Sequence, residues 1–301
     1  MEGKWLSTLL SETPAEIEWL VKPLIPTGGS FELYGKTGVG KSFLAAQLVL
    51  DVAEGKPFLG RYPTKQGKVV YIQGELTERE LSKRFETMSK LYPSVHQPVV
   101  WLPGAMMRDL DTPSQFRQVH EAVMDIKPAL ILLDPLSLVM SGDVNSQHDM
   151  LKLLKALDKW RFTDFTPATG LVHHTRKTRF DSSGEAITGG YEESGGSRAV
   201  IEWSGTILRL VRKSEEARTL LVEKLRDAAV DVDVPKRTAL IWDAKRFVFL
   251  PSDAPQRGNT IDLILSDILL TKSQKRDKLV AELKISRAQA YRMLDGGRRQ
   301  A

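Results

Sequence analysis

The sequence predicts an α/β fold in which helices cover both faces of a mostly parallel β-sheet. Short apolar strands alternate with helices from residue 30 to residue 174, and a glycine-rich loop joins the first of these strands to its helix. Such alternation is typical of parallel strands joined by crossover helices. Three further strands follow between residues 206 and 242 without helices between them, and we expect these to be antiparallel.

Each element is predicted from its local pattern. Residues 1–28 read as a helical or irregular lead-in, interrupted by prolines and glycines. Thr77 and Glu80 have the spacing of a capping box, which predicts a helix from residue 77, and Pro113 suits the first turn of the next helix. The expected strands are 30–34, 67–73, 99–102, 129–134 and 170–174, and the expected helices are 43–50, 77–91, 114–127 and 148–160.

The most informative motif follows the first strand. It has the pattern G-x-x-x-x-G-K-S and consists of Gly35, Lys36, Thr37, Gly38, Val39, Gly40, Lys41 and Ser42. Glycines let the backbone N–H groups turn toward phosphate oxygens, and the start of the following helix adds partial positive charge. The lysine can reach the β- and γ-phosphates, and the serine hydroxyl can bind Mg²⁺. These residues predict a site for ATP and Mg²⁺.

Composition narrows the class of protein. The 301 residues carry a net charge of +5 and include no cysteine, which excludes disulfides, thiolate catalysis and cysteine-bound zinc. The sequence shows no secretory signal and no apolar run of membrane-spanning length. We therefore expect a cytoplasmic protein with no membrane partner.

Two carboxylates complete the predicted chemistry. Asp134 ends an apolar strand and is expected to hold Mg²⁺ beside Ser42. Pro135 follows it instead of a glutamate, so the base that activates water must come from another segment. Glu75 follows the strand that we place next to the phosphate loop, where its carboxylate can face the γ-phosphate. The alternative for Glu75 is a surface glutamate that leads into a helix.

Together these placements resemble the RecA-like P-loop ATPases, and more closely the RepA-type and DnaB-type hexameric helicases, an AAA_25-like group. Segment 19–29, before the phosphate loop, is similar to the RepA group, and segment 193–197 is similar to the one that follows the DNA-binding loop of DnaB-like helicases. The resemblance covers residues 17–250. It implies a RecA-like P-loop NTPase core, a hexameric ring of identical subunits, and single-stranded DNA in the central channel.

The resemblance also implies roles for individual residues. Glu75 would be the catalytic base, and His173 or His174 the polar residue that senses the γ-phosphate. Lys224 and Arg226 would form a Lys-x-Arg finger that reaches the nucleotide of a neighbouring subunit. The alternatives are that the two histidines satisfy buried hydrogen bonds, and that Lys224 and Arg226 are solvated charges on a strand edge.

The loop from residue 176 to residue 198 is rich in glycine, serine and charge, and we expect it to contact single-stranded DNA. Its basic residues are Arg176, Lys177, Arg179 and Arg198. Acidic side chains in the same loop offset them, so the alternative is a connector that binds no ligand.

The C-terminal segment is basic and helical in pattern. From residue 258 onward, nine basic residues stand against five acidic ones. A helix at 274–283, a turn, and a second helix beginning at Arg287 resemble a helix-turn-helix, in which Arg287 and Arg292 contact DNA. The alternative is a small helical bundle that packs on the ATPase or on a partner.

The sequence thus predicts four regions: a lead-in (1–28), a RecA-like ATPase domain (29–250), a linker (251–259) and a small all-α helix-turn-helix domain (260–301). The predicted function is a DNA-dependent ATPase that acts as a hexameric replicative helicase, with duplex DNA as a ligand of the C-terminal domain. Two alternatives remain open: an ATP-switched DNA-binding regulator or loader, and a RecA-like recombination protein that forms open filaments.

Overall fold

The structure is a computed structural model of the chain. It describes residues 5–8, 17–92, 99–103, 109–175, 179–180, 186–187, 197–226, 234–252, 272–283 and 287. The chain separates into two compact units, Met1–Pro251 and Ser252–Ala301.

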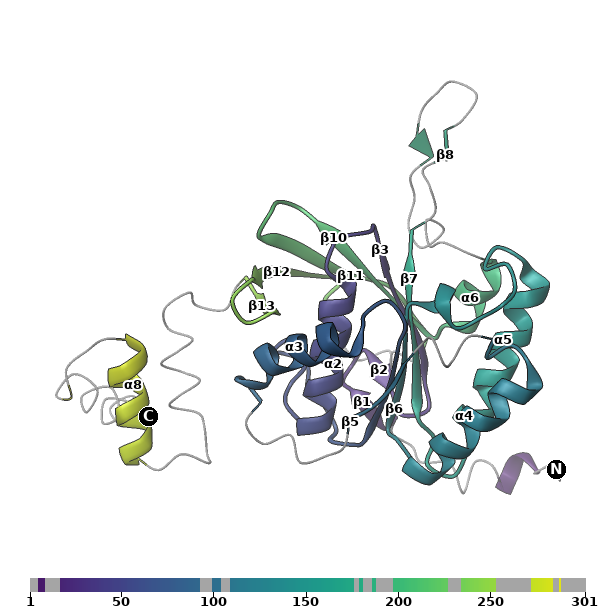
Figure 1. Ribbon diagram of the computed structural model, residues 1–301, viewed down its shortest axis with the longest axis horizontal. Coiled ribbons are helices and arrows are strands. Elements are labelled where there is room, and N and C mark those ends of the chain that lie inside the picture. The colour runs from purple at the N-terminus through teal and green to yellow at the C-terminus, as the bar shows by residue number, and fades with distance from the viewer. Residues whose placement is uncertain are drawn as a thin grey trace. The chain divides into compact units, whose positions relative to one another are not determined.

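A nine-stranded sheet, in the order β13-β12-β11-β10-β3-β7-β6-β4-β5, forms the centre of the first unit (Figure 1). Its parallel part consists of β10 (Thr206–Arg212), β3 (Ser30–Gly35), β7 (Ala168–His174), β6 (Leu130–Asp134), β4 (Val69–Gln73) and β5 (Val99–Pro103). From β10 outward the pairing is antiparallel, through β11 (Ala217–Leu225), β12 (Arg237–Asp243) and β13 (Val248–Pro251). The predicted α/β fold, mostly parallel with antiparallel C-terminal strands, is confirmed.

Helices cover both faces of the parallel strands (Figure 1). On one face lie α2 (Lys41–Glu54) and α3 (Glu78–Ser89), and on the other lie α4 (Pro113–Ile126), α5 (Gln147–Arg161) and α6 (Arg198–Trp203). A short 3₁₀ turn, η2 (Leu136–Leu138), follows β6. Each face has its own apolar core, one packed around α2 and the other around α4 and α5.

Strands β4 and β6 are apolar up to their last residue because both of their faces are buried. In β4, Val69 and Tyr71 belong to the core around α2, whereas Val70 and Ile72 belong to the core around α4 and α5. All five residues of β4 and all five of β6 are buried. Continuous apolar runs of this kind are typical of parallel strands between two helical layers.

The helix start signals of the sequence correspond to contacts in the structure. The Thr77 hydroxyl accepts a hydrogen bond from the Glu80 N–H at 3.3 Å, and the Glu80 carboxylate accepts one from the Thr77 N–H at 3.0 Å. Both halves of the predicted capping box at α3 are therefore formed. Pro113 is the first residue of α4, as expected.

Three short pairings differ from the sequence interpretation. The lead-in, expected to be helical or irregular, contains a mostly buried antiparallel pair, β1 (Trp19–Val21) and β2 (Ile25–Pro26). The loop at 176–198 contains another pair, β8 (Arg179–Phe180) and β9 (Ala186–Ile187). Strand β13 was not predicted. The turn that leads into β13 is closed by the Asp243 carboxylate, which accepts hydrogen bonds from the two N–H groups of Lys245 and Arg246.

In the second unit the structure describes α8 (Lys272–Leu283), which includes the helix expected at 274–283. Arg287 is described on its own, as a helical and exposed residue. The remainder of the expected helix-turn-helix, Arg292 included, lies outside the described residues, so the small all-α domain is not shown. Among the described helices, none has the length and the apolar character needed to span a membrane.

Candidate nucleotide-binding site

The phosphate loop connects β3 to α2. It begins at Gly35, the last residue of β3, and continues into the first turn of the 14-residue helix α2, which starts at Lys41. Gly38 and Gly40 have φ angles of 74° and 105°, in the left-handed region that favours glycine. A Cβ at Gly40 would also lie 2.7 Å from the ring of Phe249. These glycines are therefore required by the backbone that carries the loop to the helix N-terminus, where anions bind.

Lys41 is folded back onto its own loop. Its ammonium donates hydrogen bonds to the carbonyls of Gly35, at 2.8 Å, and Lys36, at 3.1 Å, and it lies 3.2 Å from Nδ1 of His174. Burial lowers the pKa of Lys41 to about 8, although the negative charges of Asp134 and Glu75 act in the opposite direction. A bound phosphate would supply the anionic partner that favours the charged lysine.

Asp134 is held between two hydroxyl groups. Ser42 donates a hydrogen bond to its Oδ1 at 3.1 Å, and Tyr71 donates one to its Oδ2 at 2.6 Å. Burial raises the pKa of Asp134, while the hydrogen bonds from Tyr71 and Ser42 lower it. Burial also raises the pKa of Tyr71, which keeps its hydroxyl protonated and able to donate.

The donors at this position fit a magnesium ion that is shared with phosphates. Ser42 and Asp134 supply the oxygen ligands that Mg²⁺ prefers. Among the described residues, no group of three or more histidine, cysteine, aspartate or glutamate side chains gathers to hold a metal. Ser42 and Asp134 would thus hold Mg²⁺ together with phosphate oxygens and water, as Mg²⁺ in phosphate sites usually requires.

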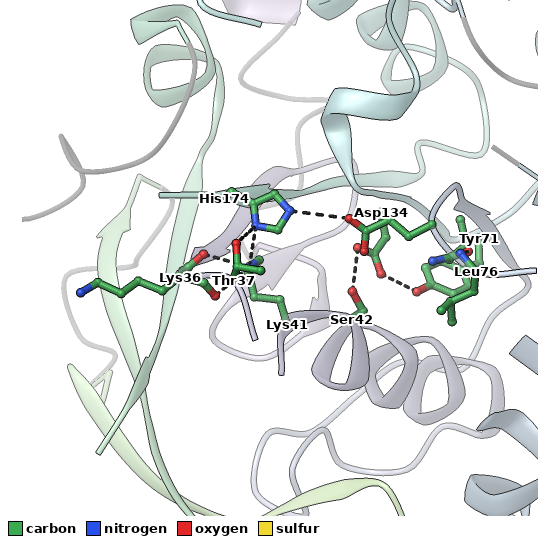
Figure 2. Close-up of polar contacts among 11 residues, drawn as sticks. Lys36, Thr37, Lys41, Ser42, Tyr71, Leu76, Asp134 and His174 are labelled. Atoms are coloured by element: carbon green, nitrogen blue, oxygen red, sulfur yellow. Dashed lines mark hydrogen bonds and ion pairs between the residues drawn. The ribbon is translucent and has the colours of Figure 1, made fainter. Parts of the chain in front are cut away.

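Glu75 and His174 lie across the same sheet edge. Nε2 of His174 is 3.8 Å from a carboxylate oxygen of Glu75, and Nδ1 is 3.4 Å from the Thr37 hydroxyl. Figure 2 shows His174 between the phosphate loop and the side of the site that holds Asp134. Burial lowers the pKa of His174, helped by the positive charge of Lys41, while Glu75 opposes the shift. The imidazole is therefore neutral at pH 7 and can donate from one nitrogen and accept at the other.

The expected placement of the strand before Glu75 is wrong in one respect. Strand β4 is not the neighbour of β3, since β7 and β6 lie between them. Glu75 still reaches the site because parallel strands end at one edge of a sheet. Its segment is fixed there by two hydrogen bonds, from the Gly74 N–H to the Asp134 carbonyl and from the Leu76 N–H to the side-chain oxygen of Gln73, both 2.9 Å long.

Of the two histidines, the structure brings only His174 to the phosphate loop. Successive side chains of a strand point to opposite faces, and His173 is 4% exposed and paired in register with Tyr34. Lys224 and Arg226 contact α6 of their own chain: their cationic groups donate to the carbonyls of Ile201 and Glu202, each at 2.6 Å. Within this chain they are not part of the site.

The candidate DNA-binding residues are described only in part. Arg198 begins α6, is exposed, and pairs with Glu202 at 3.2 Å. Arg179 lies on β8, and Arg287 is exposed. Arg176, Lys177 and Arg292 lie outside the described residues.

Sequence reasoning missed three features around the loop. Tyr71 looks like one more apolar residue of a buried strand, although its hydroxyl orients Asp134. Arg218 of β11 reaches the loop and donates to the Val39 carbonyl at 2.9 Å. An aromatic cluster at the start of α2 consists of Phe43, Trp242, Phe247 and Phe249. No local pattern marks these contacts, because each joins segments that are distant in the sequence.

Comparison with known families decides what kind of domain this is. The family model AAA_25, described as an AAA domain, matches residues 2–179, more than half of the chain. The chain belongs to this AAA domain family. It is a RecA-like P-loop ATPase domain, for which binding of ATP and Mg²⁺ is the general property. The comparison with curated proteins gave no match.

Similar folds occur among solved structures. A KaiC-like protein from Pyrococcus horikoshii OT3 has a TM-score of 0.53 and 17% identity, over 79% of this chain and 99% of that one. The flagellar accessory protein FlaH from Methanocaldococcus jannaschii has a TM-score of 0.49 and 16% identity, over 76% of this chain and 92% of that one. The first likeness supports the RecA-like fold. With 448 matching chains the fold is widespread, so it does not select a function.

The contact between Tyr71 and Asp134 predicts a role in metal binding. Tyr71→Phe removes the donor to Oδ2 and leaves that oxygen buried without it, so Asp134 is less firmly oriented and more easily protonated. We expect the Mg²⁺ concentration for half-maximal ATP turnover to rise by about tenfold. Titration of ATPase activity with Mg²⁺ measures this shift.

A matched control is Tyr92→Phe, since the Tyr92 hydroxyl donates in the same way to the buried Asp51, at 2.8 Å, away from the phosphate loop. It should lower thermal stability and leave the Mg²⁺ dependence unchanged. Identical Mg²⁺ curves for wild type and Tyr71→Phe would contradict the role given to Tyr71.

Proposed function

We propose that this chain hydrolyses ATP with Mg²⁺ at the edge of the sheet where β3, β4, β6 and β7 end. The observation that carries the proposal is the convergence of Lys41, His174 and Glu75 in one chain of contacts, with 3.2 Å between the first two and 3.8 Å between the last two. Lys41 supplies positive charge to the phosphates, and Mg²⁺ held by Ser42 and Asp134 would neutralise further phosphate charge.

Glu75 suits the role of general base. Its side chain is 46% exposed, so water can reach it, and the Gly74 and Leu76 hydrogen bonds fix its backbone. The carboxylate would accept the proton of the attacking water. His174 lies next to it with a neutral ring, and its Nε2 is placed to exchange Glu75 for a γ-phosphate oxygen as a hydrogen-bond partner.

The aromatic cluster supports a nucleotide with a flat base. Phe43 directly follows Ser42, and its ring centre is 4.7 Å from that of Trp242 and 5.3 Å from that of Phe247. The guanidinium of Arg84 lies 4.1 Å from the centre of the Phe43 ring. Aromatic faces and a stacked guanidinium favour π-systems such as a purine. We propose that the base of ATP packs against this cluster.

Glu75→Gln separates binding from chemistry. The amide keeps the shape of the side chain but cannot take up a proton, so hydrolysis should fall by about 10²-fold or more. Nucleotide affinity should change little. Turnover and equilibrium binding of ATP, measured on the same preparation, test both statements.

Glu78→Gln is the matched control, because Glu78 is an exposed glutamate three residues away, in the first turn of α3. It should retain wild-type turnover. Full activity in Glu75→Gln would remove this residue from the reaction and call for another carboxylate.

We further propose that ATP hydrolysis drives a DNA helicase of the RepA or DnaB type, a hexameric ring with single-stranded DNA in its channel. Three features support this: the similarity of segment 19–29 to the RepA group, the Lys224–Arg226 spacing at the end of β11, and the basic C-terminal segment. In a ring, the side chains of Lys224 and Arg226 would release their hydrogen bonds to the α6 carbonyls and bind the nucleotide of a neighbouring subunit. A cytoplasmic location without a membrane partner is part of the same proposal.

One observation favours a second candidate, an ATP-switched DNA-binding regulator. The basic C-terminal segment belongs to a compact unit of its own, Ser252–Ala301, and so could be the main DNA contact. The two candidates differ in what this unit does. In a helicase the ring channel binds single strands without it, whereas a regulator binds DNA through it.

Removal of residues 252–301 distinguishes the candidates. For the helicase we expect the shortened chain to keep single-strand binding and DNA-stimulated ATPase activity, with affinity that falls steeply as salt rises. Fluorescence anisotropy with single-stranded and duplex DNA, together with ATPase assays, measures these properties in the full and shortened chains.

Size analysis with an ATP analogue and single-stranded DNA completes the test. A hexamer agrees with the helicase, and an open filament would favour a recombination protein. A shortened chain that is monomeric and binds no DNA would favour the regulator.

A further inference from the structure

Arg218 is a buried arginine whose hydrogen-bond partners in the described part of the chain are all backbone carbonyls. It lies in β11, is 6% exposed, and donates from Nε to the Val39 carbonyl at 2.9 Å. Its Nη1 lies 2.7 Å from the carbonyl of Ser214 and 3.0 Å from those of Glu215 and Ala217. One guanidinium therefore joins the phosphate loop to the turn between β10 and β11.

Val39 lies between Gly38 and Gly40, so the orientation of its peptide bond to Gly40 decides which backbone group faces a bound phosphate. In a planar trans peptide the carbonyl of one residue and the N–H of the next point in opposite directions. While Arg218 holds the Val39 carbonyl, the Gly40 N–H of the same peptide points away from Arg218 and stays available as a donor to a phosphate. A reversed peptide would direct a carbonyl oxygen at the phosphate and remove a donor.

The phosphate loop packs closely against neighbouring strands at two of its glycines, Gly35 and Gly40. A Cβ at Gly35 would lie 2.4 Å from the Leu210 carbonyl of β10, and one at Gly40 would lie 2.7 Å from the Phe249 ring of β13. Gln47 of α2 also exchanges two hydrogen bonds with the backbone of Phe249, at 2.8 and 3.1 Å. Strands β10, β11 and β13 thus pack against the loop, and Arg218 supplies the charged contact.

We propose that Arg218 is a positioning residue for phosphate binding: it fixes the Val39–Gly40 peptide in the orientation that binds an anion, and it couples the β10–β11 turn to nucleotide affinity. The inference rests on the proposed ATP site. Strand β11 would thereby contribute to nucleotide binding within its own chain.

Arg218→Gln tests the proposal, because glutamine keeps a polar side chain but cannot span both sets of carbonyls. Calorimetric titration with Mg-ATP and with pyrophosphate should show affinity lowered by about tenfold or more for both, since the shared phosphate contact is lost. The matched control is Arg212→Gln. Arg212 donates to the same Ser214 carbonyl, at 3.2 Å, and is exposed, so its removal should leave both affinities unchanged.

A readout that a purely structural role would not move is chemical rescue. Added methylguanidinium should restore part of the nucleotide affinity of Arg218→Ala and leave Arg212→Ala unaffected. If Arg218→Gln does not fold, Arg218→Lys decides. Its single ammonium cannot hold the turn and the loop together, so affinity should still fall at an unchanged melting temperature.

Two results would overturn the proposal: wild-type affinity in folded Arg218→Gln, whatever its melting temperature, or wild-type affinity in Arg218→Lys. Failure of the ATP site itself looks different, because the unmodified chain would then bind neither Mg-ATP nor pyrophosphate.

Discussion

Parallel pairing of β3, β7, β6 and β4 is the constraint on which the candidate site depends. Parallel strands end at the same edge of a sheet, so the residues after them meet although they are far apart in the sequence. Gly35, Glu75, Asp134 and His174 each stand at the end of one of these strands or just beyond it. The hydrogen bond from the Gly74 N–H to the Asp134 carbonyl extends the ladder between β4 and β6 past their ends, and in this way holds Glu75 beside Asp134. The covering helices and both cores serve to keep this edge fixed.

The site holds one cationic and one anionic side chain, Lys41 and Asp134, where both are shielded from water. Burial lowers the pKa of Lys41 and raises that of Asp134, so both charged forms are disfavoured in the absence of a ligand. A phosphate next to Lys41 and a cation next to Asp134 would each reverse the corresponding effect. The hydroxyls of Ser42 and Tyr71 keep the carboxylate oriented meanwhile. Neutral His174 lies between the two halves and can change partners without taking up a proton. The electrostatics therefore favour a ligand that carries phosphates and a metal together.

Sequence reasoning succeeded where the signal is local. The phosphate loop, the capping box at Thr77 and the alternation of strands and helices all follow from patterns within a few residues. It failed where contacts join distant segments: nothing in the sequence of β4 reveals that β7 and β6 separate it from β3, and β13 is too short to stand out. The choice between His173 and His174 depends on which face a strand presents at its last residues, which the sequence leaves open. Arg218 and Tyr71 were missed because their partners lie 179 and 63 residues away.

The central claim is that the loop before α2 binds the phosphates of ATP and that Lys41 supplies the decisive charge. Calorimetric titration of Mg-ATP into wild type and Lys41→Ala, with circular dichroism as the check on folding, tests this most directly. Loss of a charge at the β- and γ-phosphates should weaken binding by about tenfold or more and abolish turnover. Equal affinity and turnover in the two folded proteins would contradict the account.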